Sequence, residues 1–201
     1  MTITYFGYGS LVNAATLHRD GIDIVPGELT GWVREWRIWG TDRLGRGVCV
    51  LSVAPEPSMS IDGVMVREPK ERLAGLEVRE HKYHRICCIG EQFRCTDRGR
   101  PGPADMFLFR SRPEYFGWGD DAHPILLSYL DCVCAGFFQN WGEAGVRRFF
   151  QTTRGWHVPV LDDRDAPIYP RAVELTGRVR DIVDELLIEY DVRILSSAER
   201  A

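Results

Sequence analysis

The sequence lacks several patterns that would assign it to a common functional class. The formal net charge is −4, and this absence of a basic surplus argues against nucleic-acid binding, which needs a basic surface. No apolar run is long enough to cross a membrane. No basic segment followed by an apolar core and a cleavage site begins the chain, so we expect no signal peptide. These absences favour a cytoplasmic protein that binds neither nucleic acid nor membrane.

Metal-binding cysteine spacing is also absent. Cys87 and Cys88 are adjacent, and Cys132 and Cys134 are separated by one residue, whereas structural zinc sites use C-x-x-C pairs. Cysteines stay reduced in a protein that is not secreted. We therefore expect free thiols buried in the core and no metal site.

The glycines near the N-terminus do not form a nucleotide-binding loop. Gly7 and Gly9 begin a G-x-G-x-x-G pattern, but Val12 occupies the third glycine position, and no G-x-x-x-x-G-K-[ST] loop is present. Residues 2–5 instead predict a strand, and Asn13 predicts the N-cap of a helix over 14–19. A glycine turn between a strand and a helix exposes backbone amides that can hold a carboxylate, a phosphate or an oxyanion. A tight turn that binds nothing is the alternative.

The rest of the chain predicts an α+β fold. Short apolar stretches bounded by glycine and proline predict strands over 29–39 (or a bent hairpin there), 48–54, 61–66, 83–89, 91–95 and 104–109. A Pro-Glu-Pro sequence at 55–57 is expected to end the second of these. Helical spacing predicts helices over 125–137, 142–153 and 173–188, with an irregular segment at 156–171. Because no repeat or linker interrupts the chain, we predict one domain over 1–201, with a curved sheet or small β-barrel, short rim helices and a helical C-terminal part.

One carboxylate is a candidate general base. Pro69 predicts the start of a helix over 70–79. Leu73, Leu76 and Glu80 follow one face of it at i, i+3 and i+7, which carries Glu80 toward the interior. Partial burial raises the pKa of a carboxyl group toward the range useful for proton transfer. The alternative is an exposed last-turn glutamate, and Glu77 is the competing carboxylate, expected in solvent.

Two motifs together resemble the gamma-glutamylcyclotransferase-like superfamily. Residues 5–11, Tyr-Phe-Gly-Tyr-Gly-Ser-Leu, resemble its F-x-Y-G-S-[LN] signature and most resemble the ChaC-type, glutathione-specific branch. Residues 76–83 are similar to the L-D-x-R-E-K-x-x-Y pattern of that branch, and 51–57 to its L-x-L-V-P-D-P. The resemblance covers about 2–137. The extension 138–201 matches nothing in the pattern, and the branch's S-G-x-N-x-x-Y-L segment is absent.

The resemblance implies a gamma-glutamylcyclotransferase-like fold and an intramolecular reaction without a metal or other cofactor. The α-amino group of a γ-glutamyl substrate attacks its own γ-carbonyl, which gives 5-oxoproline and releases the amine, Cys-Gly in the case of glutathione. Glu80 falls on the catalytic carboxylate. Matching positions predict a substrate-binding set of Phe6, Gly7, Tyr8, Gly9, Ser10, Leu11 and Tyr129.

Two alternatives stay open: a cyclotransferase for other γ-glutamyl amines or amino acids, and a non-catalytic small-molecule binding module of the same fold. The expected partner is a small molecule, and the expected state is a monomer or homodimer. Candidates for reading a distal carboxylate, which could equally be surface charges, are Arg37, Arg43, Arg46 and His123. The acidic stretch Asp162, Asp163 and Asp165 suggests either a metal or a solvated loop.

Overall fold

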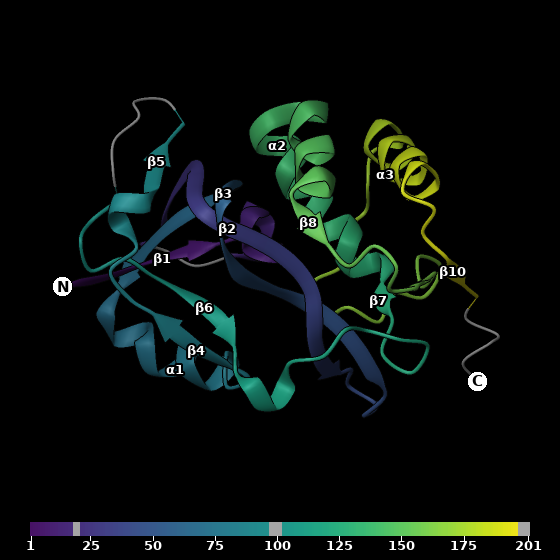
Figure 1. Cartoon of the computed structure of the whole chain (residues 1–201), viewed down its shortest axis with the longest axis horizontal. Coiled ribbons are helices and arrows are strands. Elements are labelled where there is room, and N and C mark those ends of the chain that lie inside the picture. The colour runs from purple at the N-terminus through teal and green to yellow at the C-terminus, as the bar shows by residue number, and fades with distance from the viewer. Residues whose placement is uncertain (18–20, 97–101, 197–201) are drawn as a thin grey trace.

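A computed structural model describes residues 1–17, 21–96 and 102–196 of the chain. Its scaffold is a pair of long antiparallel strands, β2 (Asp23–Thr41) and β3 (Gly47–Pro69). Both strands bend as they cross the molecule, with α1 (Leu73–Arg79) near one end and α2 (Leu127–Gln151) on the other side (Figure 1). This is the α+β fold that the sequence predicts.

The sheet is mixed and open. Its main path runs β10-β9-β7-β3-β1-β6-β4, and β2 pairs with β3, β5 and β8. The remaining strands are β1 (Thr2–Gly7), β4 (Tyr83–Ile86), β5 (Phe93–Cys95), β6 (Phe107–Ser111), β7 (Ile125–Leu126), β8 (Thr153–Arg154), β9 (Val160–Leu161) and β10 (Ile194–Leu195). Of the two predicted forms, the curved sheet is therefore correct, because the sheet does not close into a barrel within the described residues.

The predicted break at 55–57 is wrong, because β3 continues through both prolines. Pro55 lies opposite Trp32, directly beside a register shift between Thr30 and Trp32. Gly31, with a φ of 85°, is the residue between them. Residues 56–59 of β3 have no partner on β2 at this point, so Pro57 is not required to donate a hydrogen bond to β2. The same two strands are thus longer and more bent than local sequence indicates.

The observed helices agree with the predicted helices better than the observed strands agree with the predicted strands. A φ of 63° at Gly142 divides α2 at the point that separates the two predicted helices, and α3 (Gly177–Glu189) packs against α2. No helix in the described part of the chain is long and apolar enough to cross a membrane. The short 3₁₀ helices are η1 (Ser10–Val12), η2 (Ala14–Thr16), η3 (Lys70–Arg72), η4 (Gly90–Gln92) and η5 (Pro113–Tyr115).

The predicted helix over 14–19 is only partly seen. Asn13 does cap it, since its side chain accepts a hydrogen bond of 3.0 Å from the amide of Ala15. The element is a single 3₁₀ turn that ends at Thr16, while His18 and Arg19 lie outside the described residues. The cap was therefore readable from sequence, but the helix length was not.

Burial of the cysteines differs from the expectation at one pair. Cys49, Cys132 and Cys134 are buried free thiols, but Cys87 and Cys88 are exposed. Strand β4 ends at Ile86 instead of continuing to 89 as predicted. Cys88 then has a φ of 63°, an unusual backbone conformation for a residue with a side chain, so the chain turns here instead of continuing as a buried strand.

The C-terminal helical part is joined to the sheet by an aromatic cluster. Trp156 stacks on Phe150 with ring centroids 4.1 Å apart, and Trp36 of β2 packs edge-on against Trp156 at 5.7 Å. Fully buried Arg34 donates hydrogen bonds to the hydroxyls of Thr152 and Thr153. These contacts pack the C-terminal helical part onto strand β2.

Asp163 anchors the segment between α2 and α3. The residue before α2 offers no side-chain cap, and the buried Asp163 carboxylate fills this role from 35 residues away. It accepts hydrogen bonds from the amide of Ser128 at 2.7 Å, from the hydroxyl of Ser128 at 2.5 Å and from the amide of Ile168 at 2.9 Å. An anionic acceptor at a helix N-terminus satisfies orphan amides and the helix dipole together.

We expect Asp163→Ala to lower the free energy of unfolding by about 3 kcal/mol, the scale of losing a helix cap together with charge-assisted hydrogen bonds. Chemical denaturation followed by tryptophan fluorescence measures the change. Asp165→Ala is the matched control, because Asp165 is exposed. Equal losses in both variants would show that Asp163 is not an anchor.

Candidate active site

A cavity of about 160 Å³ opens where the turn after β1 meets the end of α1. The structure brings all of the sequence-predicted site residues to its wall: Phe6, Gly7, Tyr8, Gly9, Ser10, Leu11, Glu80 and Tyr129. The lining is completed by Val50, Leu51, Tyr83, Phe109, Tyr169 and Arg171. Two motifs far apart in the chain thus share one cavity, while the chemical role of each residue stays a prediction.

The glycine turn follows directly from the end of β1. Gly7 is the last paired residue, opposite Val64, and η1 begins at Ser10. Within the described chain, the backbone amides of Gly9, Ser10 and Leu11 have no hydrogen-bond partner. Their N–H groups are available to an anion, as expected for the start of a helical turn.

Gly9 also has a packing reason to lack a side chain. A Cβ atom built on Gly9 would lie 3.0 Å from the hydroxyl oxygen of Tyr129. That distance is shorter than most real Cβ contacts, so a side chain here would press on Tyr129. The bare backbone of Gly9 therefore makes room for a tyrosine hydroxyl at the wall of the cavity.

Glu80 lies at the C-terminal end of α1, half-buried as its spacing predicts. Its amide donates to the carbonyl of Leu76 at 2.9 Å, and its side chain is 18% exposed. The Nε atom of Arg79 donates to the Glu80 carboxylate at 2.8 Å. Glu77, the competing carboxylate, is 47% exposed, as expected, and it pairs with Arg85. Arg79 is the partner that the sequence did not predict, and it fixes the orientation of Glu80.

Neutral tyrosine hydroxyls surround the carboxylate. Tyr8 donates to the carbonyl of Phe109 at 2.7 Å, and Tyr83 donates to the carbonyl of Leu51 at 3.1 Å. Burial raises the pKa of Tyr8 well above its ordinary value, and the charge of Glu80 raises it further. Burial likewise raises the pKa values of Tyr83 and Tyr129. These hydroxyls stay protonated at neutral pH. Tyr8 and Tyr83 already donate their single hydrogen to backbone carbonyls, whereas Tyr129 has no such bond among the described residues.

Sequence reasoning missed two residues of the cavity, Arg171 and Tyr169. The Nη2 atom of Arg171 donates to the Ser10 hydroxyl at 2.9 Å, and its guanidinium lies 5.5 Å from the centroid of the Tyr169 ring. Arg171 forms no ion pair with a carboxylate among the described residues. Burial raises the pKa of Tyr169, and the neighbouring Arg171 and Ser10 side chains offset part of that rise. The cavity therefore holds a guanidinium that is not paired with a described protein carboxylate.

No local sequence pattern marks Tyr169 and Arg171 as residues of the site. They belong to the irregular segment 156–171, where no hydrophobic period marks an inward-facing side chain. The position of this segment depends on contacts with residues far away in the sequence. For example, the amide of Tyr169 donates a hydrogen bond to the hydroxyl of Ser128 at 3.3 Å. Only the three-dimensional path of this segment shows that Arg171 lies beside the glycine turn.

The other residues proposed to bind a distal carboxylate or a metal ion do not line this cavity. Arg37 stacks on Phe116 and Trp118, Arg46 pairs with Asp42, and His123 pairs with Asp120. Arg43 lines a second cavity next to the first. Across the described residues, no group of three or more His, Cys, Asp or Glu side chains could hold a metal ion.

Comparison with known proteins supports a fold but no closer relationship. No family model matches the chain, and no curated protein matches it significantly. A solved gamma-glutamyl cyclotransferase is similar, with a TM-score of 0.58 and 13% identity over 92% of this chain and 99% of the other. An uncharacterised protein from Homo sapiens has a TM-score of 0.55 and 14% identity over 91% of this chain and 98% of its own.

A third similar structure is YkqA from Bacillus subtilis. Its TM-score is 0.54 at 16% identity, and the match covers 77% of this chain but 56% of YkqA. The resemblance read from the two motifs therefore agrees with a likeness in three dimensions that spans nearly the whole chain. The protein has the fold of the gamma-glutamyl cyclotransferases.

Proposed function

We propose that this protein is a gamma-glutamylcyclotransferase, which releases 5-oxoproline from a γ-glutamyl substrate without a cofactor. One observation carries the proposal: the cavity beside the glycine turn contains both the Glu80 carboxylate and the Arg171 guanidinium. An α-amino acid head group carries an ammonium and a carboxylate. The two side chains match these two charges, and no described protein carboxylate competes for Arg171.

The proposed reaction begins with binding of the glutamyl head group. Its α-carboxylate accepts hydrogen bonds from Arg171 and from amides of the turn at Gly9 to Leu11. Its α-ammonium lies at Glu80, and the Glu80 carboxylate accepts one proton from it. The amine lone pair then attacks the γ-carbonyl carbon, which forms the new C–N bond and a tetrahedral oxyanion. Holding the amine and carbonyl together in a folded-back substrate supplies several kcal/mol of the barrier reduction.

Collapse of the oxyanion completes the cycle. The C–N bond to the leaving amine breaks as protonated Glu80 gives its proton to that nitrogen. The ring nitrogen still carries a second hydrogen and a positive charge, and it loses this proton to the released amine. Glu80 therefore ends ionised, beside a neutral lactam and a protonated amine. Tyr129, which burial keeps protonated, lies at the cavity wall and can donate a hydrogen bond to the developing oxyanion. The products are 5-oxoproline and a free amine.

An assay of 5-oxoproline release tests the proposal. The protein is incubated with glutathione and with several γ-glutamyl amino acids, and 5-oxoproline is measured by mass spectrometry. We expect product from at least one donor. Release of Cys-Gly from glutathione would identify ChaC-type specificity, and product only from other donors would identify a different cyclotransferase.

The non-catalytic alternative has its own outcome. If no donor yields 5-oxoproline but a γ-glutamyl compound raises the melting temperature, the cavity is a binding module. If no donor reacts and none raises the melting temperature, the cavity does not bind γ-glutamyl compounds at all, and the proposal is wrong.

A further inference from the structure

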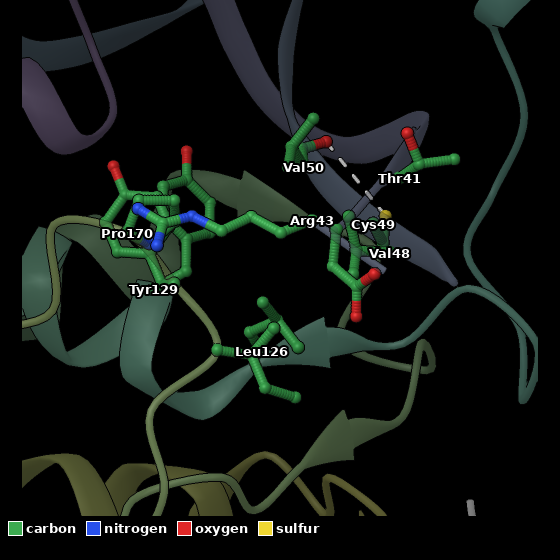
Figure 2. A pocket seen from close by; sticks show the side chains of 11 residues that line it. Thr41, Arg43, Val48, Cys49, Val50, Leu126, Tyr129 and Pro170 are labelled. Atoms are coloured by element: carbon green, nitrogen blue, oxygen red, sulfur yellow. Dashed lines mark hydrogen bonds between the residues drawn. The ribbon is translucent and has the colours of Figure 1, made fainter. Parts of the chain in front are cut away.

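A second cavity, of about 280 Å³, adjoins the proposed site. It shares Val50, Tyr129 and Tyr169 with the first cavity. Figure 2 shows its lining, in which side chains from β2 and β3 meet those from the start of α2 and from the irregular segment before α3. The two cavities therefore lie on either side of the same three side chains. In a γ-glutamyl substrate, the part that extends beyond the glutamyl unit is the leaving amine.

The walls of the second cavity are mainly apolar. Val48 and Leu126 are buried, and Ile168 contributes a half-buried side chain. Burial raises the pKa of the Cys49 thiol to about 12, so this side chain is neutral at physiological pH. Transfer of an apolar group from water into such a cavity is favourable. Transfer of a peptide bond is unfavourable, because the peptide bond loses its hydrogen bonds with water.

One acidic side chain, Asp42, lines this cavity, and its negative charge is already paired with Arg46. Its carboxylate accepts hydrogen bonds from the Arg46 side chain at 2.8 Å, the Arg46 amide at 2.9 Å and the Leu44 amide at 2.8 Å. Arg43 differs, because it forms no ion pair with any described carboxylate. Its long side chain reaches along the cavity in Figure 2. The cavity thus combines an apolar interior with one guanidinium available for an anion.

We infer that the leaving amine is an apolar α-amino acid, with its side chain in the second cavity and its carboxylate at Arg43. The inference rests on the proposed function and narrows its substrate to γ-glutamyl derivatives of amino acids such as leucine or methionine. Glutathione fits this space less well. Its Cys-Gly leaving group has a small side chain and adds a peptide bond that the apolar walls leave without partners.

A donor series tests the inference. The value of kcat/KM is measured for γ-glutamyl-glycine, γ-glutamyl-alanine, γ-glutamyl-leucine, γ-glutamyl-methionine and glutathione. We expect γ-glutamyl-leucine to exceed γ-glutamyl-glycine by ~10- to 200-fold, the discrimination available to an apolar pocket. Product with no rise along the series, or with glutathione as the best donor, overturns the inference and leaves the proposed function intact. No product from any donor overturns the proposed function itself.

Filling the cavity gives a second readout. Ile168→Trp is expected to lower the leucine-to-glycine ratio of kcat/KM about tenfold or more, because the new ring occupies the space of the leaving-group side chain. Ile188→Trp is the matched control, since Ile188 is 81% exposed on α3, and it should keep the wild-type ratio. Thermal melts establish that both variants are folded. Equal ratios in the two variants would overturn the assignment of this cavity.

The role of Arg43 is tested with one change in the protein and one in the donor. Arg43→Gln is expected to lower kcat/KM about tenfold for γ-glutamyl-leucine, which is the scale of losing one exposed charge-assisted hydrogen bond. With γ-glutamyl-leucinamide, whose carboxylate is replaced by a neutral amide, the same substitution should change little. An equal effect on both donors would show that Arg43 does not read the carboxylate.

Discussion

Replacing Glu80 with glutamine is expected to lower turnover of a γ-glutamyl donor by ~100-fold or more, the usual scale for a general acid or base. The glutamine is nearly the same size and can still accept a hydrogen bond, but it cannot take the proton from the substrate ammonium. Without that transfer the amine has no lone pair for attack. The measurement is kcat for 5-oxoproline release at saturating donor, because the loss should fall on the chemical step.

Glu77→Gln is the matched control for this substitution. Glu77 lies on the same helix, one turn earlier, but it is 47% exposed and absent from the cavity wall. Each variant also loses one arginine pair, Arg79–Glu80 or Arg85–Glu77, which costs ~1 kcal/mol or less at such exposure. Stability should therefore be similar in the two variants. Normal turnover in Glu80→Gln would exclude the proposed mechanism.

The parts of this site that sequence predicts are those whose position depends on neighbours in the chain. The turn at residues 7–11 follows from a strand that ends in glycines. The half-buried position of Glu80 follows from helical spacing with Leu73 and Leu76. Both predictions rest on the residue spacing of a single strand or helix, which a short stretch of sequence is enough to show. The meeting of the two elements in one cavity became an expectation only through the family resemblance.

Other features depend on contacts between residues far apart in the sequence, and the sequence did not predict them. The prolines at 55–57 predicted the end of a strand, yet β3 continues beyond them and pairs with β2 again from Ser60. Whether the sheet closes into a barrel depends on the twist and pairing of all its strands, and no single segment encodes it. Gly9 was expected to bind substrate, and its close approach to the Tyr129 hydroxyl could not be read from the sequence.

Arg171 is the clearest case of such long-range placement, and it gives the other large expected effect. We expect Arg171→Gln to lower kcat/KM for a γ-glutamyl donor by ~30- to 3,000-fold, the loss when one partner of a buried charge pair is removed. The substrate carboxylate would otherwise enter the cavity without a counter-charge. Most of the loss should be in KM, because the contact is present in both the ground state and the transition state.

Arg178→Gln is the control, since Arg178 is exposed on α3 and pairs with Glu143, away from the cavity. It should leave both kinetic constants unchanged. Thermal melts should show little destabilisation in Arg171→Gln, because the Arg171 side chain contacts the uncharged side chains of Ser10 and Tyr169 and forms no ion pair with a described carboxylate. A large fall in melting temperature would point instead to a structural role.

A donor without the α-carboxylate separates substrate binding from any indirect effect. A 4-aminobutanoyl amide cyclises by the same attack but gives 2-pyrrolidinone and has no anion for Arg171. The wild-type protein should strongly prefer the γ-glutamyl donor, and Arg171→Gln should lose most of that preference. If the substitution lowers kcat/KM equally for both donors, Arg171 does not bind the carboxylate. If the preference collapses, the irregular C-terminal segment supplies half of the head-group recognition, with Glu80 supplying the other half.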